Sequence, residues 1–164
     1  MQVDRLRPGD AERLRRIRLR ALVDSPDAFG STAADTAARP AHSWVQQLTE
    51  LHTLVAVLDG ADIGMVRGAP SGDDPHDAYL LSMWVDPDHR RRGVGEALVA
   101  ALTAWARSAG FARLLLDVAD HNAQAIALYT RCGFAPTGRA GSLPPPRDTI
   151  TEHERALCIK PSPV

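Results

Sequence analysis

One turn between two patterned segments constrains the fold of this chain most strongly. Residues 78–85 form an apolar run typical of a strand, and Glu96 to Ala109 repeats apolar residues at helical spacing. Between them lies Arg90-Arg91-Arg92-Gly93-Val94-Gly95. A strand that turns directly into a helix leaves the first helical N–H groups unpaired, and the helix dipole adds positive charge there. The sequence therefore predicts an anion site at this turn.

The residue types at the turn favour a pyrophosphate as the anion. Gly93 and Gly95 carry no side chain that would keep a phosphate away from the N–H groups. The three arginines supply forked donors for phosphate oxygens. The pattern is not the dinucleotide fingerprint, because position 98 is Leu, and no Gly-Lys-Ser/Thr follows as in a P-loop.

A second segment follows about 30 residues later. An apolar run at 114–118 predicts a strand, and Asn122, Ala125 and Tyr129 then share one stripe of a helix that ends before Gly133-Phe134. Together the two segments, over residues 78–138, resemble the GNAT family of N-acetyltransferases. The matching positions are Arg90, Gly93, Gly95, Asn122, Ala125, Tyr129, Gly133 and Phe134.

The resemblance implies an α/β (α+β) fold in one domain over residues 1–164. This GNAT fold has a central mixed sheet of about seven strands flanked by about four helices, and strands four and five run parallel and then splay apart. It also implies acetyl-CoA as co-substrate, with its pantetheine arm entering the splay. The expected cofactor-binding residues are Trp84, Val85, Arg90, Arg91, Arg92, Gly93, Val94, Gly95, Asn122, Ala125 and Tyr129.

Hydrophobic periodicity and turn residues predict the order β-α-α-β-β-β-α-β-α-β-β. The predicted strands are 2–7, 53–58, 63–67, 78–85, 113–118, a strand starting at 134, and 152–159; the predicted helices are 11–23, 41–51, 96–109 and 122–132. Asp59-Gly60-Ala61-Asp62 predicts a hairpin. Residues 28–40 and 138–149 are expected to be loops.

Two residues of the second segment allow two roles each. Asn122 is a favoured helix N-cap, and by resemblance it also faces the pantetheine amides. Tyr129 is either a core aromatic or the general acid that protonates the departing thiolate, since a phenol is protonated at neutral pH. The resemblance also places a backbone N–H near Trp84 and Val85 against the acetyl carbonyl.

A general base is not evident in the sequence. Residues 79–85 hold no carboxylate, although many family members carry a Glu on this strand. Asp24, Asp35, His153 or Glu154 could act through water, and each could equally be an ordinary surface residue. Cys132 and Cys158 are expected to be small core residues. A route through an acetyl-cysteine is not expected, because neither cysteine has an adjacent base in the sequence.

Composition limits the partners of the chain. With a net charge of -1 and no wider basic surface, nucleic acid is not an expected partner. No stretch reaches the length of a membrane span, no secretory signal is visible, and two cysteines do not make a disulfide framework, so a cytoplasmic location is expected. No Cys/His cluster has the spacing of a metal site.

The expected reaction is direct attack by the primary amine of a small molecule or peptide on acetyl-CoA in a ternary complex. Two rivals remain open: a CoA-binding module without catalysis, and an unrelated nucleotide-binding protein. A homodimer is compatible with the resemblance. The acceptor is expected to enter opposite the cofactor, between the segments 24–40 and 138–149, where Asp24, Asp27 and Asp35 could attract a cationic amine.

Overall fold

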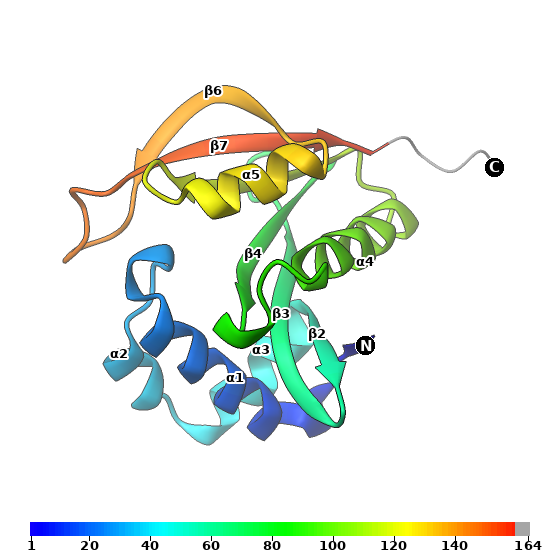
Figure 1. Ribbon diagram of the computed structural model, residues 1–164, viewed down its shortest axis with the longest axis vertical. Helices are drawn as coiled ribbons and strands as arrows, with labels where there is room; N and C mark the ends of the chain where they lie inside the picture. The colour runs from blue at the N-terminus through cyan, green and yellow to red at the C-terminus, as the bar shows by residue number, and fades with distance from the viewer. Residues whose placement is uncertain (160–164) are drawn as a thin grey trace.

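All seven strands join one mixed sheet, in the order β1-β2-β3-β4-β5-β7-β6 (Figure 1). A computed structural model describes residues 1–159. The strands are β1 Gln2–Arg5, β2 His52–Leu58, β3 Ala61–Pro70, β4 Asp77–Val85, β5 Arg113–Ala119, β6 Ala135–Ser142 and β7 Thr151–Cys158. The helices are α1 Ala11–Asp24, α2 Ala33–Ala37, α3 Ala41–Glu50, α4 Val94–Ser108 and α5 Ala123–Arg131. The predicted fold class is confirmed.

Most predicted elements are present, and two loop predictions are partly wrong. The short helix α2 lies inside the segment 28–40, where Thr32 accepts a hydrogen bond from the Asp35 N–H as its N-cap. Strand β6 continues to Ser142, into the segment predicted as a loop from 138. Its register with β7 shifts around Gly138, and all its residues are exposed, so it carries no hydrophobic alternation.

The predicted hairpin joins β2 to β3. Leu58 pairs with Ala61, which leaves Asp59 and Gly60 as the two loop residues. Both have positive φ, 51° and 78°, as a type I′ turn requires. The Asp-Gly dipeptide therefore identified the turn correctly.

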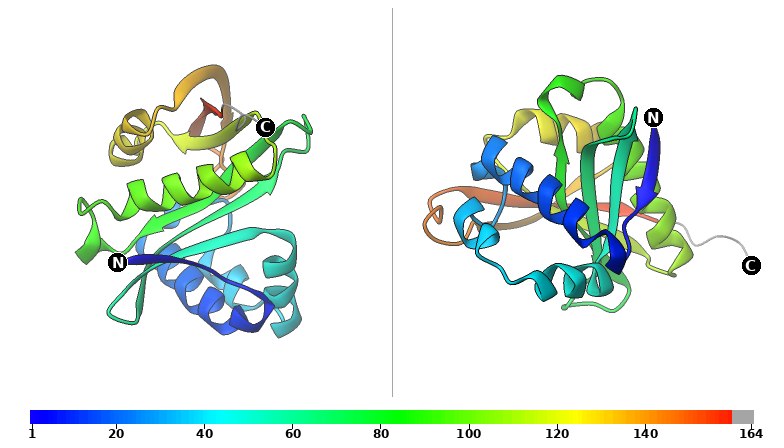
Figure 2. Two further views of the ribbon diagram at one scale, coloured as in Figure 1. Left: turned by 90° about the vertical axis from the view of Figure 1, so that its right-hand side faces the viewer. Right: turned by 90° about the horizontal axis from the view of Figure 1, so that it is seen from below.

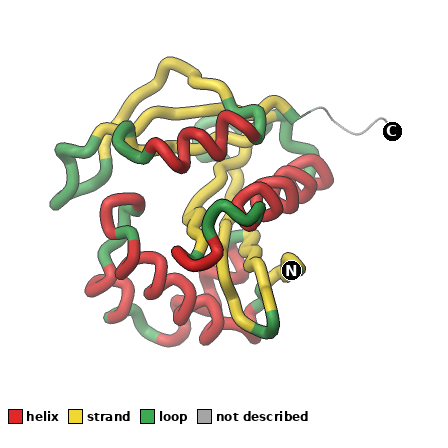
Figure 3. The backbone as a smooth tube through the Cα atoms, viewed as in Figure 1, coloured by secondary structure: helices red, strands yellow, loops and turns green. Residues whose placement is uncertain are grey.

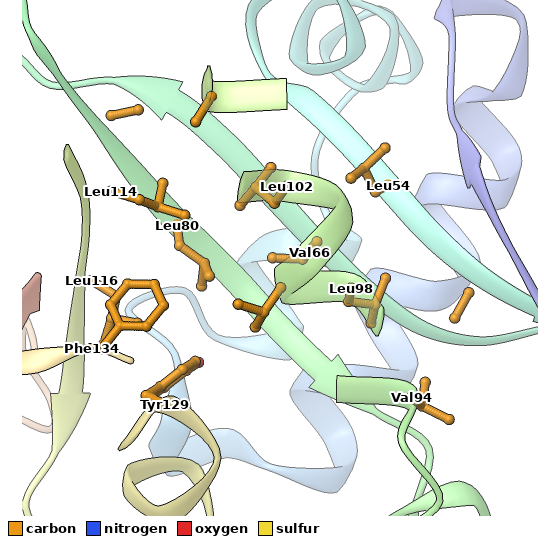
Figure 4. Packing of buried hydrophobic residues seen from close by; sticks show 14 of the residues in the cluster. Leu54, Val66, Leu80, Val94, Leu98, Leu102, Leu114, Leu116, Tyr129 and Phe134 are labelled. Carbon is orange, nitrogen blue, oxygen red and sulfur yellow. The ribbon is translucent and has the colours of Figure 1, made fainter. Parts of the chain in front are cut away.

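Helices cover both faces of the sheet (Figure 2), and one hydrophobic cluster lies on each face. On one face α4 and α5 pack over the strands, and Leu98 and Leu102 of α4 lie against Val66 and Leu80, as Figure 4 shows. On the other face α1 and α3 contribute Leu14, Ile17, Leu22, Trp44 and Leu48. The segments that carry the predicted motifs therefore lie on one face, and the first three helices lie on the opposite face.

Strands β4 and β5 are parallel and pair over three positions only, Asp77 to Tyr79 with Arg113 to Leu115. Beyond that point β4 runs on to Val85 and β5 to Ala119 without pairing to each other. The predicted divergence of strands four and five is therefore present at the centre of the sheet, and it opens beside the ends of both strands.

A bulge in β4 lies next to the point where the strands separate. Arg67 pairs with Leu81 and Met65 with Trp84, so Ser82 and Met83 together oppose Val66. Ser82 has a φ of 54°, rare for a non-glycine residue. The extra residue reverses the alternation of side chains. Leu80 therefore packs under α4, whereas Trp84 packs on the opposite face with α1.

Within residues 1–159, no helix combines the length and apolar character that a bilayer span needs.

Candidate active site

A cavity of about 390 Å³ lies where β4 and β5 diverge. One part of its wall comes from β4 and β5, including Ser82, Met83 and Asp117. Another comes from α5, and further parts come from α1, the segment that follows α1, the loop between β6 and β7, Arg67 of β3 and Glu152 of β7. Figure 1 shows α5 on one side of this region and α1 and α2 on the other. The cavity therefore joins the second cofactor motif on α5 to the segments expected to hold the acceptor.

The turn from β4 to α4 has the geometry of an anion site (Figure 3). Helix α4 begins at Val94, and its N-cap residue Gly93 has a φ of 81°. The glycine at the N-cap supplies no capping side chain, so apart from the Glu96 N–H, which bonds the Glu96 carboxylate, the first N–H groups of the helix are open to a ligand. Arg91 and Arg92 are exposed beside it. The uncapped terminus and two free arginines support the predicted pyrophosphate site.

Gly95 has a structural role that the sequence did not indicate. It is buried at the contact between α4 and α5, and a Cβ added there would lie 2.9 Å from Leu128 Cδ2. Gly93 is different, since a Cβ there would meet nothing and its positive φ is the reason for glycine. Gly95 therefore lets two helices approach each other, in addition to its proposed place beside the phosphates.

Arg90 is tied to the protein rather than directed into solvent. Its Nε donates to the Val85 carbonyl at 2.9 Å, and its Nη2 donates to the Asp24 carboxylate. Asp24 also accepts from the Trp84 indole N–H at 2.9 Å. Burial raises the pKa of Asp24, but the hydrogen bonds from Ser25, Trp84 and Arg90 outweigh this and hold it below its usual value. Arg90 and Trp84 thus position the turn against α1.

The backbone of Val85 faces the divergence of the strands. The Asp86 N–H donates to the Ile63 carbonyl of β3 at 2.9 Å. Because successive residues of an antiparallel strand point their N–H groups to opposite sides, the Val85 N–H is directed away from β3. This orientation supports the predicted role of the Val85 N–H as a donor to a carbonyl oxygen in the cleft.

Asn122, Ala125 and Tyr129 all line the cavity, as their common helical stripe predicted. The Asn122 side chain accepts from the Ala125 N–H at 3.2 Å, which confirms it as the N-cap of α5. Ala125 presents only a methyl group to the cavity. The stripe therefore combines a polar end, a small central residue and a phenol.

Tyr129 is buried against Phe134, with ring centroids 5.7 Å apart (Figure 4). Burial raises its pKa above the usual phenol value, so the hydroxyl is protonated at neutral pH. This packing agrees with the first of its two predicted roles, that of a core aromatic residue. Yet no residue within 1–159 hydrogen-bonds its hydroxyl, and the side chain lines the cavity, so the proton is available to a ligand there.

Two carboxylates on the far wall of the cavity are the acids best placed for proton transfer. Asp117 of β5 and Glu152 of β7 both line it. Burial and the nearby charge of Glu154 raise the pKa of Asp117, although Arg139 opposes this. Burial and Asp117 raise the pKa of Glu152. A raised carboxyl pKa brings a general base closer to working pH.

The four base candidates named from the sequence do not line this cavity. Asp24 is held by three donors and faces a neighbouring pocket, and Asp35 binds Thr32. Glu154 is buried and accepts hydrogen bonds from the Tyr79 hydroxyl at 2.7 Å and from Thr137 at 2.8 Å, while His153 is exposed on β7. Asp24 and Glu154 therefore serve the structure.

Two buried arginines, Arg18 of α1 and Arg67 of β3, also line the cavity. Arg67 donates to Ser82 Oγ at 3.0 Å and to Gln47 Oε1 at 2.8 Å, so it fixes the bulge of β4. The Arg18 guanidinium lies 4.6 Å from the centroid of the Phe29 ring. Both arginines place positive charge beside a space that a ligand could occupy.

The sequence alone did not point to these acids and arginines as site residues, although two of them stand out in its pattern. Arg18 lies between Leu14 and Leu22 at helical spacing, on the apolar stripe of α1. Asp117 interrupts an apolar strand. Glu152 had no local signal, because only the pairing of β5 with β7 brings it near Asp117. Among the described residues, no three His, Cys, Asp or Glu side chains are grouped as a metal site would need.

Comparison with known proteins yields one family and many relatives. Residues 18–134 match the model of the acetyltransferase (GNAT) family. Mycothiol acetyltransferase of Cellulomonas flavigena is 32% identical over 142 residues, which cover 79% of this chain and 39% of that protein. Human N-acetyltransferase 8 is 38% identical over 90 residues, 52% of this chain and 39% of that protein. The chain thus matches about two fifths of the length of these relatives.

Solved structures show the same fold at low identity. An acetyltransferase of the GNAT family from Streptococcus pneumoniae superposes with a TM-score of 0.82 at 20% identity, covering 97% of this chain and 99% of that chain. The structure of yncA from Salmonella typhimurium with its cofactor acetyl-CoA has a TM-score of 0.77 at 19% identity, covering 100% of this chain and 96% of that one.

Proposed function

The chain belongs to the acetyltransferase (GNAT) family, and from this premise we propose that it transfers an acetyl group from acetyl-CoA to a primary amine in a ternary complex. The observation that carries the proposal is the cavity where β4 and β5 diverge, which Asn122, Ala125 and Tyr129 of the second motif line. The acceptor is a small molecule or peptide amine.

The described residues fit the donor substrate. The uncapped α4 terminus with Gly93, Arg91 and Arg92 would hold the pyrophosphate. Ala125 would leave room for the pantetheine arm, and Asn122 would meet its amides. Acetyl-CoA supplies the acetyl group as a thioester, which an amine can attack without further activation.

The chain's own groups then serve three purposes. The Val85 N–H would stabilise the oxyanion that develops on the acetyl carbonyl. Asp117 or Glu152 would take a proton from the amine nitrogen as the C–N bond forms. Tyr129 would give its proton to the sulfur as the C–S bond breaks. An ammonium substrate thus yields an amide, a thiol and one released proton, and holding both reactants together supplies much of the rate.

A CoA-binding module without catalysis is the competing function. The unpartnered hydroxyl of Tyr129 and the cavity acids favour catalysis, because binding alone would not require them. The proposal keeps a cytoplasmic location, which agrees with both cysteines being free thiols. A homodimer remains part of the proposal on the family resemblance alone.

Two measurements test the proposal. Calorimetry should detect acetyl-CoA binding, and a panel of primary amines with detection of released thiol should reveal turnover. Arg92→Glu should weaken acetyl-CoA binding by about tenfold or more, because it reverses a charge beside the phosphates. Arg16→Glu, a reversal at an exposed arginine of α1, is the control. Binding without turnover of any amine would favour the module, and absence of binding would refute the proposal.

A further inference from the structure

Two positive side chains are buried in the wall of the cavity without a carboxylate partner. Arg18 is 5% exposed and Arg67 is 7% exposed. The charges that act on Arg18 are those of Arg67 and Arg39, and the charge that acts on Arg67 is that of Arg39; all are positive. Within residues 1–159 neither forms an ion pair. The protein therefore collects positive charge here and leaves it uncompensated.

The hydrogen bonds of the two arginines are also incomplete. Arg18 Nη1 is buried and has no partner in the described part of the chain. Arg67 donates only to neutral oxygens, Ser82 Oγ and Gln47 Oε1. Burial, followed by the repulsion of neighbouring arginines, lowers the pKa of Arg18 to about 9 and that of Arg67 to about 10. Both stay charged at neutral pH, at a cost in stability that a bound anion would remove.

The same cavity also contains two acidic side chains. Asp117 and Glu152 come from β5 and β7, whereas Arg18 and Arg67 come from α1 and β3. Apolar groups also line the cavity, including Leu81, which is 37% exposed, and Leu143. The cavity is therefore bipolar, with a cationic end, an anionic end and an apolar lining.

We infer that the acceptor is an amino acid, whose carboxylate binds between Arg18 and Arg67 and whose amine faces Asp117 and Glu152. The inference rests on the proposed function, since it identifies the substrate class of that site. An amino acid carries both a carboxylate for the arginines and an amine for the acids, and a guanidinium is the donor that matches a carboxylate. Leu81 and Leu143 favour an apolar side chain. A peptide N-terminus lacks the carboxylate next to its amine and would leave Arg18 unpaired.

The first experiment compares matched acceptors in a thiol-release assay. Leucine, methionine and phenylalanine are each measured beside the corresponding carboxamide, which keeps the amine and side chain but removes the negative charge. We expect kcat/KM for the acids to exceed that for the amides by about tenfold or more, as for a hydrogen-bonded charged group. Equal or faster turnover of the amides would overturn the inference and leave the proposed function intact.

The second experiment uses variants. Arg18→Gln and Arg67→Gln should raise KM for the acid by about 10- to 100-fold and change little for the amide. Arg16→Gln, two residues before Arg18 and exposed on the same helix, should change neither. Unchanged binding of CoA by calorimetry would establish that each variant is folded. A preference for acids that survives in both folded variants would overturn the inference.

A third measurement does not depend on turnover. Calorimetry with CoA-saturated protein compares N-acetyl-leucine with N-acetyl-leucinamide, the products of the two reactions. We expect the acid to bind at least about tenfold more tightly, and Arg18→Gln to abolish the difference. If this difference is found but no amine is acetylated, the proposed catalytic function is wrong and the inferred carboxylate site is still supported. No binding of either product, or equal binding of both, contradicts the site.

Discussion

At the end of α1 the Asp24 carboxylate joins three segments that are far apart in sequence. It accepts from Ser25 beside it, from the Trp84 indole at the end of β4 and from Arg90 in the turn before α4. A carboxylate with three donors has little tendency to take a proton. Asp24, which the sequence suggested both as a general base and as a residue that attracts a cationic amine, therefore holds β4 and the following turn against α1.

Tyr129→Phe separates the two roles of the phenol. The ring would still pack on Phe134, so melting temperature and acetyl-CoA affinity should stay close to those of the unsubstituted protein. If the hydroxyl protonates the leaving sulfur, kcat should fall by roughly 100-fold or somewhat less. Single-turnover rates measure this directly. Full activity in a folded variant would show that water protonates the thiolate. Because burial raises the pKa of Tyr129, its ionisation should not limit activity at moderately basic pH.

Asp117→Asn should stabilise the protein at neutral pH and reduce turnover. The pKa of Asp117 is raised in the folded state by burial and by Glu154, so the folded protein binds this proton more tightly than the unfolded chain. This carboxylate therefore costs stability above its folded pKa, and the cost disappears as pH falls below its unfolded pKa. The variant should gain melting temperature at pH 7 but not at pH 3. An equal gain at both pH values would contradict this account.

At the scale of elements, sequence patterns predicted segments whose burial follows a simple period. Helix α4 and strands β4 and β5 have continuous or regularly spaced apolar residues, and their bounds agree within a few residues. Strand β6 had no such pattern, because it is a fully exposed edge held only by β7. The bulge at Ser82 was also invisible, since no turn residue marks it. Local patterns report burial, and these two features depend on pairing.

Gly95→Ala tests whether the contact between α4 and α5 requires a glycine. The new methyl group would lie 2.9 Å from Leu128 Cδ2, closer than side-chain carbons pack, so the helices must separate or Leu128 must move. Because the contact is with the end of the flexible, partly exposed Leu128 side chain, we expect a loss near the lower end of the about 1–3 kcal/mol that overpacking costs, which thermal unfolding can measure.

The matched control for that variant is the double change Gly95→Ala with Leu128→Ala. Leu128 lies at the edge of the core cluster and is partly exposed, so its removal should make room for the methyl group. We expect the double variant to lose less stability than the sum of the two single changes. Simple additivity would mean that Gly95 is not required by this contact.

At the scale of the whole molecule, one arginine closes the ring of segments around the cavity. Arg147, in the loop between β6 and β7, donates to the Gly30 carbonyl at 2.9 Å and also to the Pro26 carbonyl. Leu143 and Pro144 of the same loop line the cavity together with Phe29 and Gly30. The segments predicted to wall the acceptor entrance are thus bound to each other across more than 100 residues of sequence.

Arg147→Ala should loosen this closure without disturbing the cofactor motifs. We expect a higher KM for the acceptor, by a few-fold to about tenfold, with acetyl-CoA affinity nearly unchanged. Arg16→Ala, at an exposed arginine of α1, is the control. If Arg147→Ala lost acetyl-CoA binding and kept its KM for the acceptor, the proposed position of the acceptor site would be wrong.

The cofactor motifs could be predicted because they are contiguous in sequence, as Asn122, Ala125 and Tyr129 show. The acceptor side could not, because Arg18, Arg67, Asp117 and Glu152 come from four separate elements and meet only in the fold. Asp24 illustrates the opposite error: its residue type fits a base, but only the structure shows the donors that occupy it.

The three-residue ladder between β4 and β5 has a consequence for the lifetime of the protein. Beyond Tyr79 and Leu115, β4 and β5 form no hydrogen bonds to each other, although both lie in the middle of the sheet. Backbone amides that face this gap should therefore exchange with solvent early. Acetyl-CoA seated there would bridge both edges, and at a concentration 100 times its Kd it would add about 2.7 kcal/mol to stability by mass action.

Resistance to proteases would then rise and fall with the supply of acetyl-CoA, and the protein would persist longest when its donor is abundant. Limited proteolysis and hydrogen exchange of residues 80–85, each with and without acetyl-CoA, measure this coupling. If saturating acetyl-CoA changed neither the cleavage rate nor the exchange rates, the centre of the sheet would already be protected without the ligand.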